Sequence, residues 1–249
     1  MLADLSLALD AHGIPVSYHH STNLHGALME MINPDYANKL HQSGINPFSM
    51  CLLGTSALEW HVRTITDEAY EQIIMPLLNN SFTSFTIKNE INIDVTSKSL
   101  KTLDYKTLMN EFCDKACGNR FSMSFKTPVS FKVRNRYWNM PDIRLILQSL
   151  MKKYSAEGNE NAIDKDTLDQ LAEAFEPNRY NLSSTVFPME GIVIPSFTGN
   201  LSFRIRGKET MARYVRLLLR FGEFSGIGIK CSIGMGAIQF QGGDNENGH

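Results

Sequence analysis

The chain has 249 residues, of which 43% are hydrophobic and 20% are charged, and its formal net charge is −2 at pH 7. These values are ordinary for one large or two smaller globular domains, and they exclude a low-complexity or disordered chain. No apolar run reaches the roughly 18 residues that a membrane span requires. The acidic start, with Asp4 and no basic residue before it, is not that of a signal peptide.

The cysteines predict a reducing compartment and no metal site. Cys113 and Cys117 lie one helical turn apart, but no second pair completes a zinc site, and Cys51 and Cys231 stand alone. We therefore expect a cytoplasmic protein with reduced thiols.

The net charge conceals an uneven distribution. Residues 120–153 and 201–230 are basic, whereas residues 1–119 and 154–179 are acidic. Local positive charge on an otherwise acidic protein is typical of a site for a polyanion. Charge runs also occur on ordinary solvated surfaces, so this pattern alone leaves both interpretations open.

In chain order, the first half reads as strands and helices that alternate in a defined pattern. Apolar residues at helical spacing predict a helix capped by Ser21 or Thr22, and Asn33 followed by Pro34 predicts a second, short helix. Residues 96–119 carry weak signals and are expected to form a further strand or a connection. The strands are expected at residues 2–9, 48–54, 59–64, 81–88 and 90–95, and the helices at residues 22–32, 35–41 and 67–78.

The second half repeats this order. A strand over residues 120–131 precedes a helix over residues 143–154, and an acidic insertion is expected at about residues 156–176. A hairpin follows, with strands 185–194 and 199–206 around a turn at 195–198. A helix over residues 208–221, with Gly222 as its C-cap, and a last strand over residues 237–241 complete the half.

Both halves thus have the order β-α-β-β-α-β of a ferredoxin-like fold. The predicted class is α+β with two tandem domains, residues 1–119 and residues 120–241, followed by a disordered tail at residues 242–249. Two such domains side by side leave a cleft between their sheets, which would suit single-stranded or hairpin RNA.

Near the C-terminus, residues 226–236 form a glycine-rich loop. Glycine permits positive φ, so successive N–H groups of such a loop can converge on an anion, and Lys230 and Ser232 would add a cation and a hydroxyl. The pattern is neither the phosphate loop of nucleotide hydrolases nor a dinucleotide fingerprint, because the helix precedes the glycines. The alternative is a plain glycine-rich connection between two strands.

Two histidines are candidates for proton transfer, because imidazole titrates near neutral pH. His41 is expected at the C-terminal end of the second helix, where the helix dipole favours its protonated form. His25 lies in the first helix. The alternatives are a helix-end histidine bonded to carbonyls and a helix histidine that faces the partner domain.

Three stretches together resemble the CRISPR-associated repeat-cleaving endoribonucleases of the RAMP superfamily. Each stretch is weak alone, but in this order they span nearly the whole chain, and the pattern is most similar to the form that serves Csm-type complexes. They are residues 24–28 with 37–41 and 47–49, residues 125–132 with Tyr137 and 141–142, and the glycine-rich loop with the helix before it.

The resemblance implies two tandem ferredoxin-like, RRM-like domains and RNA cleavage without a metal or cofactor. The ribose 2′-hydroxyl would attack its own phosphate, leaving a 2′,3′-cyclic phosphate and a 5′-hydroxyl. His41 matches the position of the family's catalytic histidine and would act as the base, with His25 as the second candidate. Lys230, Arg134 and Arg136 are the candidates for the charge stabiliser. Met29 stands where some members have a catalytic tyrosine, and residues 42–47 contain no lysine.

The implied partner is CRISPR repeat RNA in its precursor, with transient association with a Csm-type complex; homodimer formation is left open, and no membrane is expected. Non-catalytic RNA binding, as a structural subunit of a guide-RNA complex, is the first alternative, and a nucleotide-binding enzyme that uses the loop for a phosphate is the second. The expected RNA contacts are Gly226, Gly228, Lys230, Ser232, Gly234 and Gly236 in the loop, Arg204, Arg206 and Arg213 in the same groove, and Lys126, Lys132, Arg134 and Arg136 on the second-half strand and the loop after it.

Overall fold

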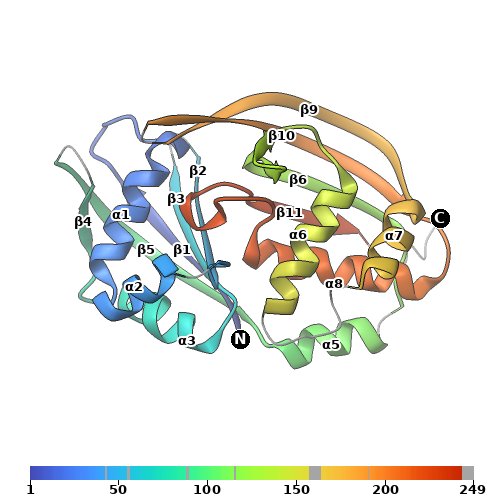
Figure 1. The fold of residues 1–249 in the computed structure, drawn as a ribbon. Coiled ribbons are helices and arrows are strands. Elements are labelled where there is room, and N and C mark those ends of the chain that lie inside the picture. Colours follow the sequence, from blue (N-terminus) through green and yellow to red (C-terminus); the bar gives the residue numbers. More distant parts are fainter. Residues whose placement is uncertain are drawn as a thin grey trace.

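Two antiparallel sheets, one from each half of the chain, form the framework of the molecule (Figure 1). We describe a computed structural model, which places residues 1–42, 44–54, 57–87, 90–114, 116–156, 164–189 and 191–242. The expected tail lies outside these residues except for Gly242, as does part of the acidic insertion, residues 157–163. None of the helices in the described ranges is long and apolar enough to cross a membrane.

The first sheet has the strand order β2-β3-β1-β5-β4, with every neighbouring pair antiparallel. Alternation along β1 buries Leu5 and Leu7 in a core shared with the helices. The expected order β-α-β-β-α-β is confirmed, with β4 added at the edge; the segment after residue 95 continues the last strand. The strands are β1 (Leu2–Asp10), β2 (Phe48–Leu53), β3 (Leu58–Thr64), β4 (Ser84–Ile87) and β5 (Ile91–Leu103).

Side-chain caps explain where some of the helical segments of the first half begin. The Asn33 Oδ1 accepts the backbone N–H groups of Asp35 at 2.9 Å and Tyr36 at 3.3 Å, so the predicted cap of the second helix is confirmed. Ser21 and Thr22 do not cap the first helix, because it continues directly from a 3₁₀ turn, Tyr18–His20, capped by Ser17. The helical segments are α1 (Ser21–Met31), α2 (Pro34–Gln42), and α3 (Asp67–Ala69) joined through a π-helical turn, Tyr70–Ile74, to α4 (Met75–Leu78).

The second sheet has the order β11-β6-β10-β9, which is the strand arrangement of a ferredoxin-like domain. Phe121, Met123 and Phe125 alternate along β6 and face the core under the helices. Its strands are β6 (Arg120–Val129), β9 (Phe175–Met189), β10 (Ile192–Ile205) and β11 (Ile238–Gly242), and a separate hairpin is formed by β7 (Phe131–Val133) and β8 (Arg136–Trp138). The helices are α5 (Tyr105–Asp114), α6 (Ile143–Ala156), α7 (Lys165–Ala174) and α8 (Glu209–Ser225).

Two expectations for the second half are wrong. The hairpin turn lies between β9 and β10, near Gly191, and residues 195–198 belong to β10. Pro195 is tolerated there because the β6 pairing extends only to Phe197, so this end of β10 behaves as an edge strand. Gly222 lies inside α8, where a Cβ would come within 2.7 Å of Leu150, and Gly226 is the C-cap.

Two helices pack on the second core although the sequence pattern placed one in an insertion and the other in the first domain. Leu168 and Leu171 of α7 are buried in that core, so α7 forms part of its packing. Helix α5 precedes the expected boundary at residue 119, yet Leu108 joins the second core and Arg216 of α8 donates to the Glu111 carbonyl. We therefore propose a boundary near residue 104.

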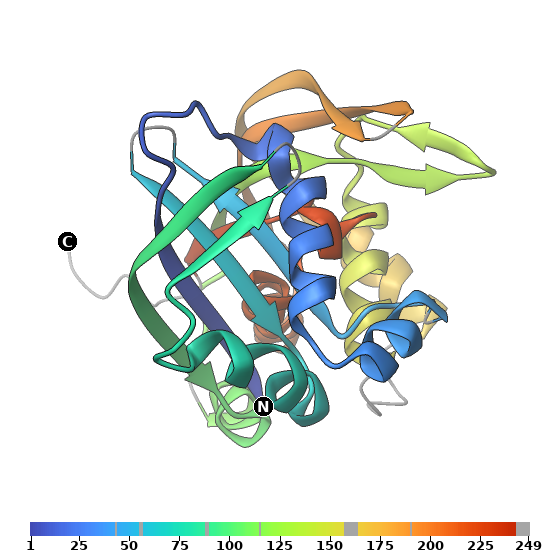
Figure 2. The ribbon, with the colours of Figure 1, turned by 90° about the vertical axis from the view of Figure 1, so that its left-hand side faces the viewer.

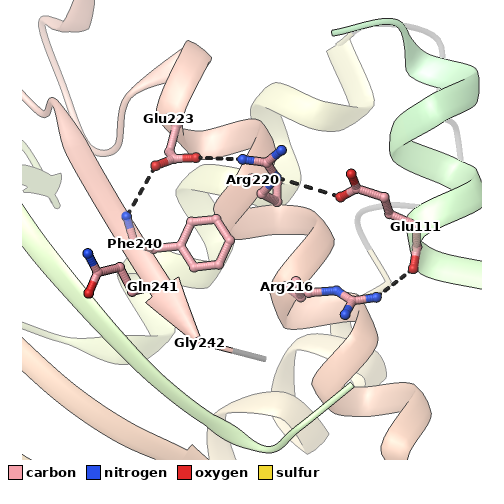
Figure 3. Close-up of a pocket in the computed structure, with 7 residues that line it drawn as sticks. All are labelled: Glu111, Arg216, Arg220, Glu223, Phe240, Gln241 and Gly242. Atoms are coloured by element: carbon pink, nitrogen blue, oxygen red, sulfur yellow. Dashed lines mark hydrogen bonds and ion pairs between the residues drawn. The ribbon is translucent and has the colours of Figure 1, made fainter. Parts of the chain in front are cut away.

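A charged pocket of about 360 Å³ lies where α5, α8 and β11 meet (Figure 3). The Arg220 guanidinium reaches Glu111 at 3.6 Å and Glu223 at 3.4 Å, and the Glu223 carboxylate accepts the Phe240 N–H. Burial raises the pKa of Glu223, although the charges of Arg220 and of Arg63 in β3 oppose that shift. The carboxylate thus joins α8 to β11 and lies within electrostatic reach of Arg63 in the first sheet.

Candidate active site

The glycine-rich loop leaves α8 and folds back on itself before β11. Gly226, at φ +65°, closes the helix by donating its N–H to the Gly222 carbonyl at 2.8 Å. A Cβ on Gly228 would lie 2.3 Å from the Ser130 carbonyl oxygen, and a Cβ on Gly234 would lie 2.5 Å from the Ser21 Cβ. Close backbone approach therefore requires glycine at both positions.

Most amides of the loop are already bonded within the protein. Gly228 donates to the Ser149 hydroxyl at 2.8 Å, Gly234 to the Cys231 carbonyl at 3.4 Å and Gly236 to the Pro128 carbonyl at 3.0 Å. The N–H groups of these three glycines and of Gly226 are thus committed. Because these N–H groups already have acceptors within the protein, the structure does not support their expected role as phosphate donors.

One part of the loop keeps its amides open. In the described part of the chain, no acceptor is paired with the N–H groups of Lys230, Cys231 and Ser232. Lys230 is left-handed, at φ +58°, and a 3₁₀ turn, Cys231–Ile233, follows it. A left-handed residue followed by a right-handed turn makes successive N–H groups converge, which is the geometry of an anion-binding nest.

The loop lies beside α1 of the first half (Figure 2), and a bond across this contact fixes His25. The His25 Nδ1 donates to the Ser232 carbonyl at 2.9 Å, and its ring lies parallel to Phe48 at a centroid distance of 6.1 Å. Asn46 adds a second bond across the same junction, from its Nδ2 to the Ser232 Oγ at 3.0 Å. A neutral imidazole that donates through Nδ1 has its free lone pair on Nε2.

His41 and Lys230 share the electrostatic environment of His25. Burial lowers the pKa of His25 below its ordinary value, and the positive charges of His41 and Lys230 lower it further, while the bond to Ser232 opposes the shift. His41, in the last turn of α2, and Lys230 are both exposed. His41 and Lys230 are therefore near enough to His25 to act on it electrostatically.

A basic hairpin projects from the second half next to the loop. Strands β7 and β8 meet at Arg134 and Asn135, which are both left-handed and exposed, and the hairpin also exposes Lys132 and Arg136. Ser130 at its base accepts the Ile229 N–H of the loop at 3.0 Å. In Figure 2 the hairpin extends outward beside β9 and β10. Lys126, from β6, is exposed and donates its backbone N–H to the Ala237 carbonyl beside the loop.

The expectation that Arg204, Arg206 and Arg213 line the same groove as the loop is wrong. Arg204 pairs with Arg120 at one end of β6, whereas the loop bonds Pro128 at the other end, about 26 Å away at ~3.3 Å per strand residue. Their charges are also engaged elsewhere. Arg204 and Arg206 pair with Glu176, and Arg213 pairs with Glu209 and donates to the Cys113 carbonyl.

Sequence reasoning missed Asn46, Ser149 and Ser130 as partners of the loop. Their contacts with the loop join positions 79 to 186 residues apart in the chain. No local pattern marks Asn46 or Ser149. Ser130 lies in the stretch 125–132, but it bonds the loop through its backbone carbonyl, which no side-chain pattern reveals. In the described ranges, no group of three or more His, Cys, Asp or Glu side chains has an arrangement that could hold a metal ion.

Comparison with known proteins connects this site with a family. A family model described as "CRISPR-associated endoribonuclease Cas6" matches residues 123–238. A protein of that name from Mycobacterium tuberculosis is 37% identical over 222 residues, covering 88% of this chain and 71% of the relative. One from Streptococcus thermophilus is 34% identical over 223 residues, covering 89% and 91%.

Solved structures agree in fold. A Thermus thermophilus Cas6 in a product complex superimposes with a TM-score of 0.78 at 20% identity, covering 97% of this chain and 100% of that one. Another Cas6, in a substrate-mimic complex, gives a TM-score of 0.72 at 20% identity, covering 96% and 99%. By sequence relationship and fold, the chain belongs to the family of CRISPR-associated endoribonucleases named Cas6, and it is an RNA endonuclease.

Proposed function

We propose that this protein cleaves CRISPR repeat RNA in its precursor transcript, without a metal ion, to make guide RNAs. The ribose 2′-oxygen forms a bond to the adjacent phosphorus while the bond from phosphorus to the 5′-oxygen breaks. The products are a 2′,3′-cyclic phosphate and a 5′-hydroxyl. The observation that carries this proposal is the bond from His25 Nδ1 to the Ser232 carbonyl, within electrostatic reach of His41 and Lys230.

In this mechanism His25 is the general base. Its Nδ1 proton is held by the Ser232 carbonyl, so Nε2 is the nitrogen that takes the proton of the 2′-hydroxyl. Burial lowers the pKa of His25, which keeps the imidazole neutral at neutral pH. This assignment differs from the sequence-based expectation, in which His41 takes the 2′ proton.

His41 then serves as the general acid and Lys230 as the charge stabiliser. His41 is exposed at the end of α2, so it can take a proton from water and give it to the leaving 5′-oxygen. Lys230 carries one of the open amides of residues 230–232 and an exposed ammonium, and both kinds of group can stabilise the charge on the phosphorane. The Lys230 ammonium and these amides would thus take the place of the lysine that some family members have between residues 42 and 47.

The RNA strand would enter over the basic hairpin. Lys132, Arg134 and Arg136 are exposed there and would contact backbone phosphates, and Lys126 extends the basic surface toward the loop. DNA lacks the 2′-hydroxyl nucleophile, so the chemistry selects RNA. Membership of a family of endoribonucleases favours cleavage over the non-catalytic alternative.

We further propose action in the cytoplasm, transient association with a Csm-type complex, and self-association. Four free thiols support action in the cytoplasm. Association with a Csm-type complex is supported by sequence resemblance alone. Self-association is supported by two exposed apolar side chains near the β9–β10 turn, Ile192 and Val193. Sedimentation of the purified protein and co-purification with effector subunits test the last two proposals.

The proposed function is tested with repeat RNA and purified protein in the presence of a chelator. Wild-type protein should cleave and leave the stated ends, and a single 2′-deoxy sugar at the cut should abolish turnover. His25→Ala and His41→Ala should each slow single-turnover cleavage by about 10²- to 10⁴-fold. His12→Ala, which removes an exposed histidine paired with Asp94, is the matched control. Wild-type rates in both site variants would refute the site.

A further inference from the structure

Lys153 lies in the last turn of α6, but its ammonium bonds the end of another helix and the glycine-rich loop. Helices α6 and α8 pack side by side in the second half (Figure 1). The Nζ donates to the Ser225 carbonyl at 3.0 Å, the Gly226 carbonyl at 2.9 Å and the Cys231 sulfur at 2.9 Å. An ammonium has three N–H groups, so these bonds use all of them and leave none for an RNA phosphate.

The three acceptors connect a helix end to the middle of the loop. The carbonyls of residues 225 and 226 lie at the C-terminus of α8, where the helix leaves acceptors unpaired and carries partial negative charge. Cys231 belongs to the 3₁₀ turn that holds the open amides, and its thiol in turn donates to the Ile227 carbonyl at 3.2 Å. The ammonium therefore fixes the position of this turn relative to α8.

A second residue of α6 supports the same loop. Ser149 lies four residues before Lys153, on the same face of the helix, and its hydroxyl accepts the Gly228 N–H at 2.8 Å. Helix α6 thus holds the loop at two points, one on each side of Lys230.

We infer that Lys153 is a positioning residue for the RNA cleavage reaction. It fixes Cys231, the neighbour of Ser232, and the Ser232 carbonyl determines which nitrogen of His25 carries the proton. Without the ammonium the turn can move, and the Ser232 carbonyl no longer holds the proton on Nδ1 of His25. Nε2 is then no longer fixed as the unprotonated nitrogen that acts as the base. This inference rests on the proposed role of His25.

The test compares Lys153→Met with Lys152→Met, which removes the same charge from an exposed position on the same helix. Displacement of a catalytic group by ~1 Å costs on the order of 10²-fold in rate. We expect Lys153→Met to lower the single-turnover rate at saturating RNA by about 10- to 100-fold, with RNA affinity within about threefold of wild type. Lys152→Met should leave the rate unchanged.

The second readout is the tautomer of His25, measured by nitrogen NMR on protein labelled at histidine, with the signal assigned from His25→Gln. Neutral wild-type His25 should carry its proton on Nδ1, and Lys153→Met should shift the signal toward a mixture of both tautomers. This readout does not depend on catalysis. Cleavage by His25→Ala at the wild-type rate would refute the assignment of His25 as the base. The NMR measurement of the His25 tautomer would still show whether Lys153 positions the imidazole ring.

Two results would overturn the inference. The first is a Lys153→Met protein with the wild-type rate and the Nδ1–H signal intact. The second is a parallel loss of RNA affinity and rate with an unchanged tautomer, which would make Lys153 an RNA contact. Where Lys153→Met does not fold, Ser149→Ala removes the other tie and should lower the rate and disturb the tautomer in the same direction; unchanged values there would equally overturn the inference.

Discussion

Replacing Gly234 by alanine should separate the loop from α1 and slow cleavage. The new Cβ would lie 2.5 Å from the Ser21 Cβ, whereas ordinary contact begins at 3.4 Å, so one of the two elements must move by about 0.9 Å. Gly234 is two residues from Ser232, whose carbonyl holds His25. A displacement of this size at a catalytic group costs on the order of 10²-fold in rate.

The same substitution has a stability cost with two parts. Alanine at φ +114° is strained by roughly 1–3 kcal/mol, and overpacking against Ser21 costs a further 1–3 kcal/mol or so. Gly13→Ala is the matched control, because Gly13 has φ +79° and no atom lies within 4 Å of its added Cβ. It should show the strain alone, about 1–3 kcal/mol, and full activity.

The assay combines urea unfolding with single-turnover cleavage at a temperature where both variants are folded. The account predicts a Gly234→Ala protein that is about 2–6 kcal/mol less stable than wild type and roughly 100-fold slower. A folded Gly234→Ala protein that cleaves as fast as Gly13→Ala would show that the loop contact does not position His25, and would refute the reasoning.

Three further predictions concern RNA binding and buried charge. Arg134→Ala with Arg136→Ala should weaken RNA binding and reduce the slope of log affinity against log salt by about 2, measured by filter binding at several salt concentrations; an unchanged slope would remove the hairpin from the interface. Asp4 contacts the buried Arg63 at 3.2 Å, and Asp4→Asn should cost about 3–5 kcal/mol in urea unfolding, because a buried cation loses its partner; a cost below about 1 kcal/mol would contradict this. Burial raises the pKa of Glu223, so its ionisation destabilises the folded state as the pH rises through that pKa. Glu223→Gln should therefore be more stable than wild type at pH 7, with the difference lost at pH about 4; equal stability at both pH values would contradict it.

Local rules predicted the elements that local interactions determine. Alternation gave the strands around Leu5 and Phe121, and the Asn33 side chain bonds N–H groups only two and three residues away. Where a residue type has two uses, the surrounding structure decided between them. Pro195 signals a turn, but it is accommodated in the edge-like end of β10, and Gly222 signals a helix end, but it makes room for Leu150.

The site was predicted only in part, for a related reason. His25, His41 and Lys230 are distant in sequence, and only the family resemblance joined them. The charge pattern did not show which arginines have acidic partners, so Arg204 and Arg206, both paired with Glu176, were expected at the RNA. The glycine pattern correctly located the loop, yet some of its amides bond the carbonyls of Pro128 and Ser130 and the hydroxyl of Ser149, which no local pattern reveals.

The division of labour between the two histidines is tested most directly with an RNA in which sulfur replaces the 5′-oxygen at the cut. The sulfur departs without being protonated. This substrate therefore restores the cleavage rate only of a variant that lacks the general acid. The account predicts that the sulfur substrate restores cleavage by His41→Ala to near the wild-type rate and leaves His25→Ala slow. Restoration of His25→Ala instead, with His41→Ala still slow, would contradict the assignment of His25 as the base.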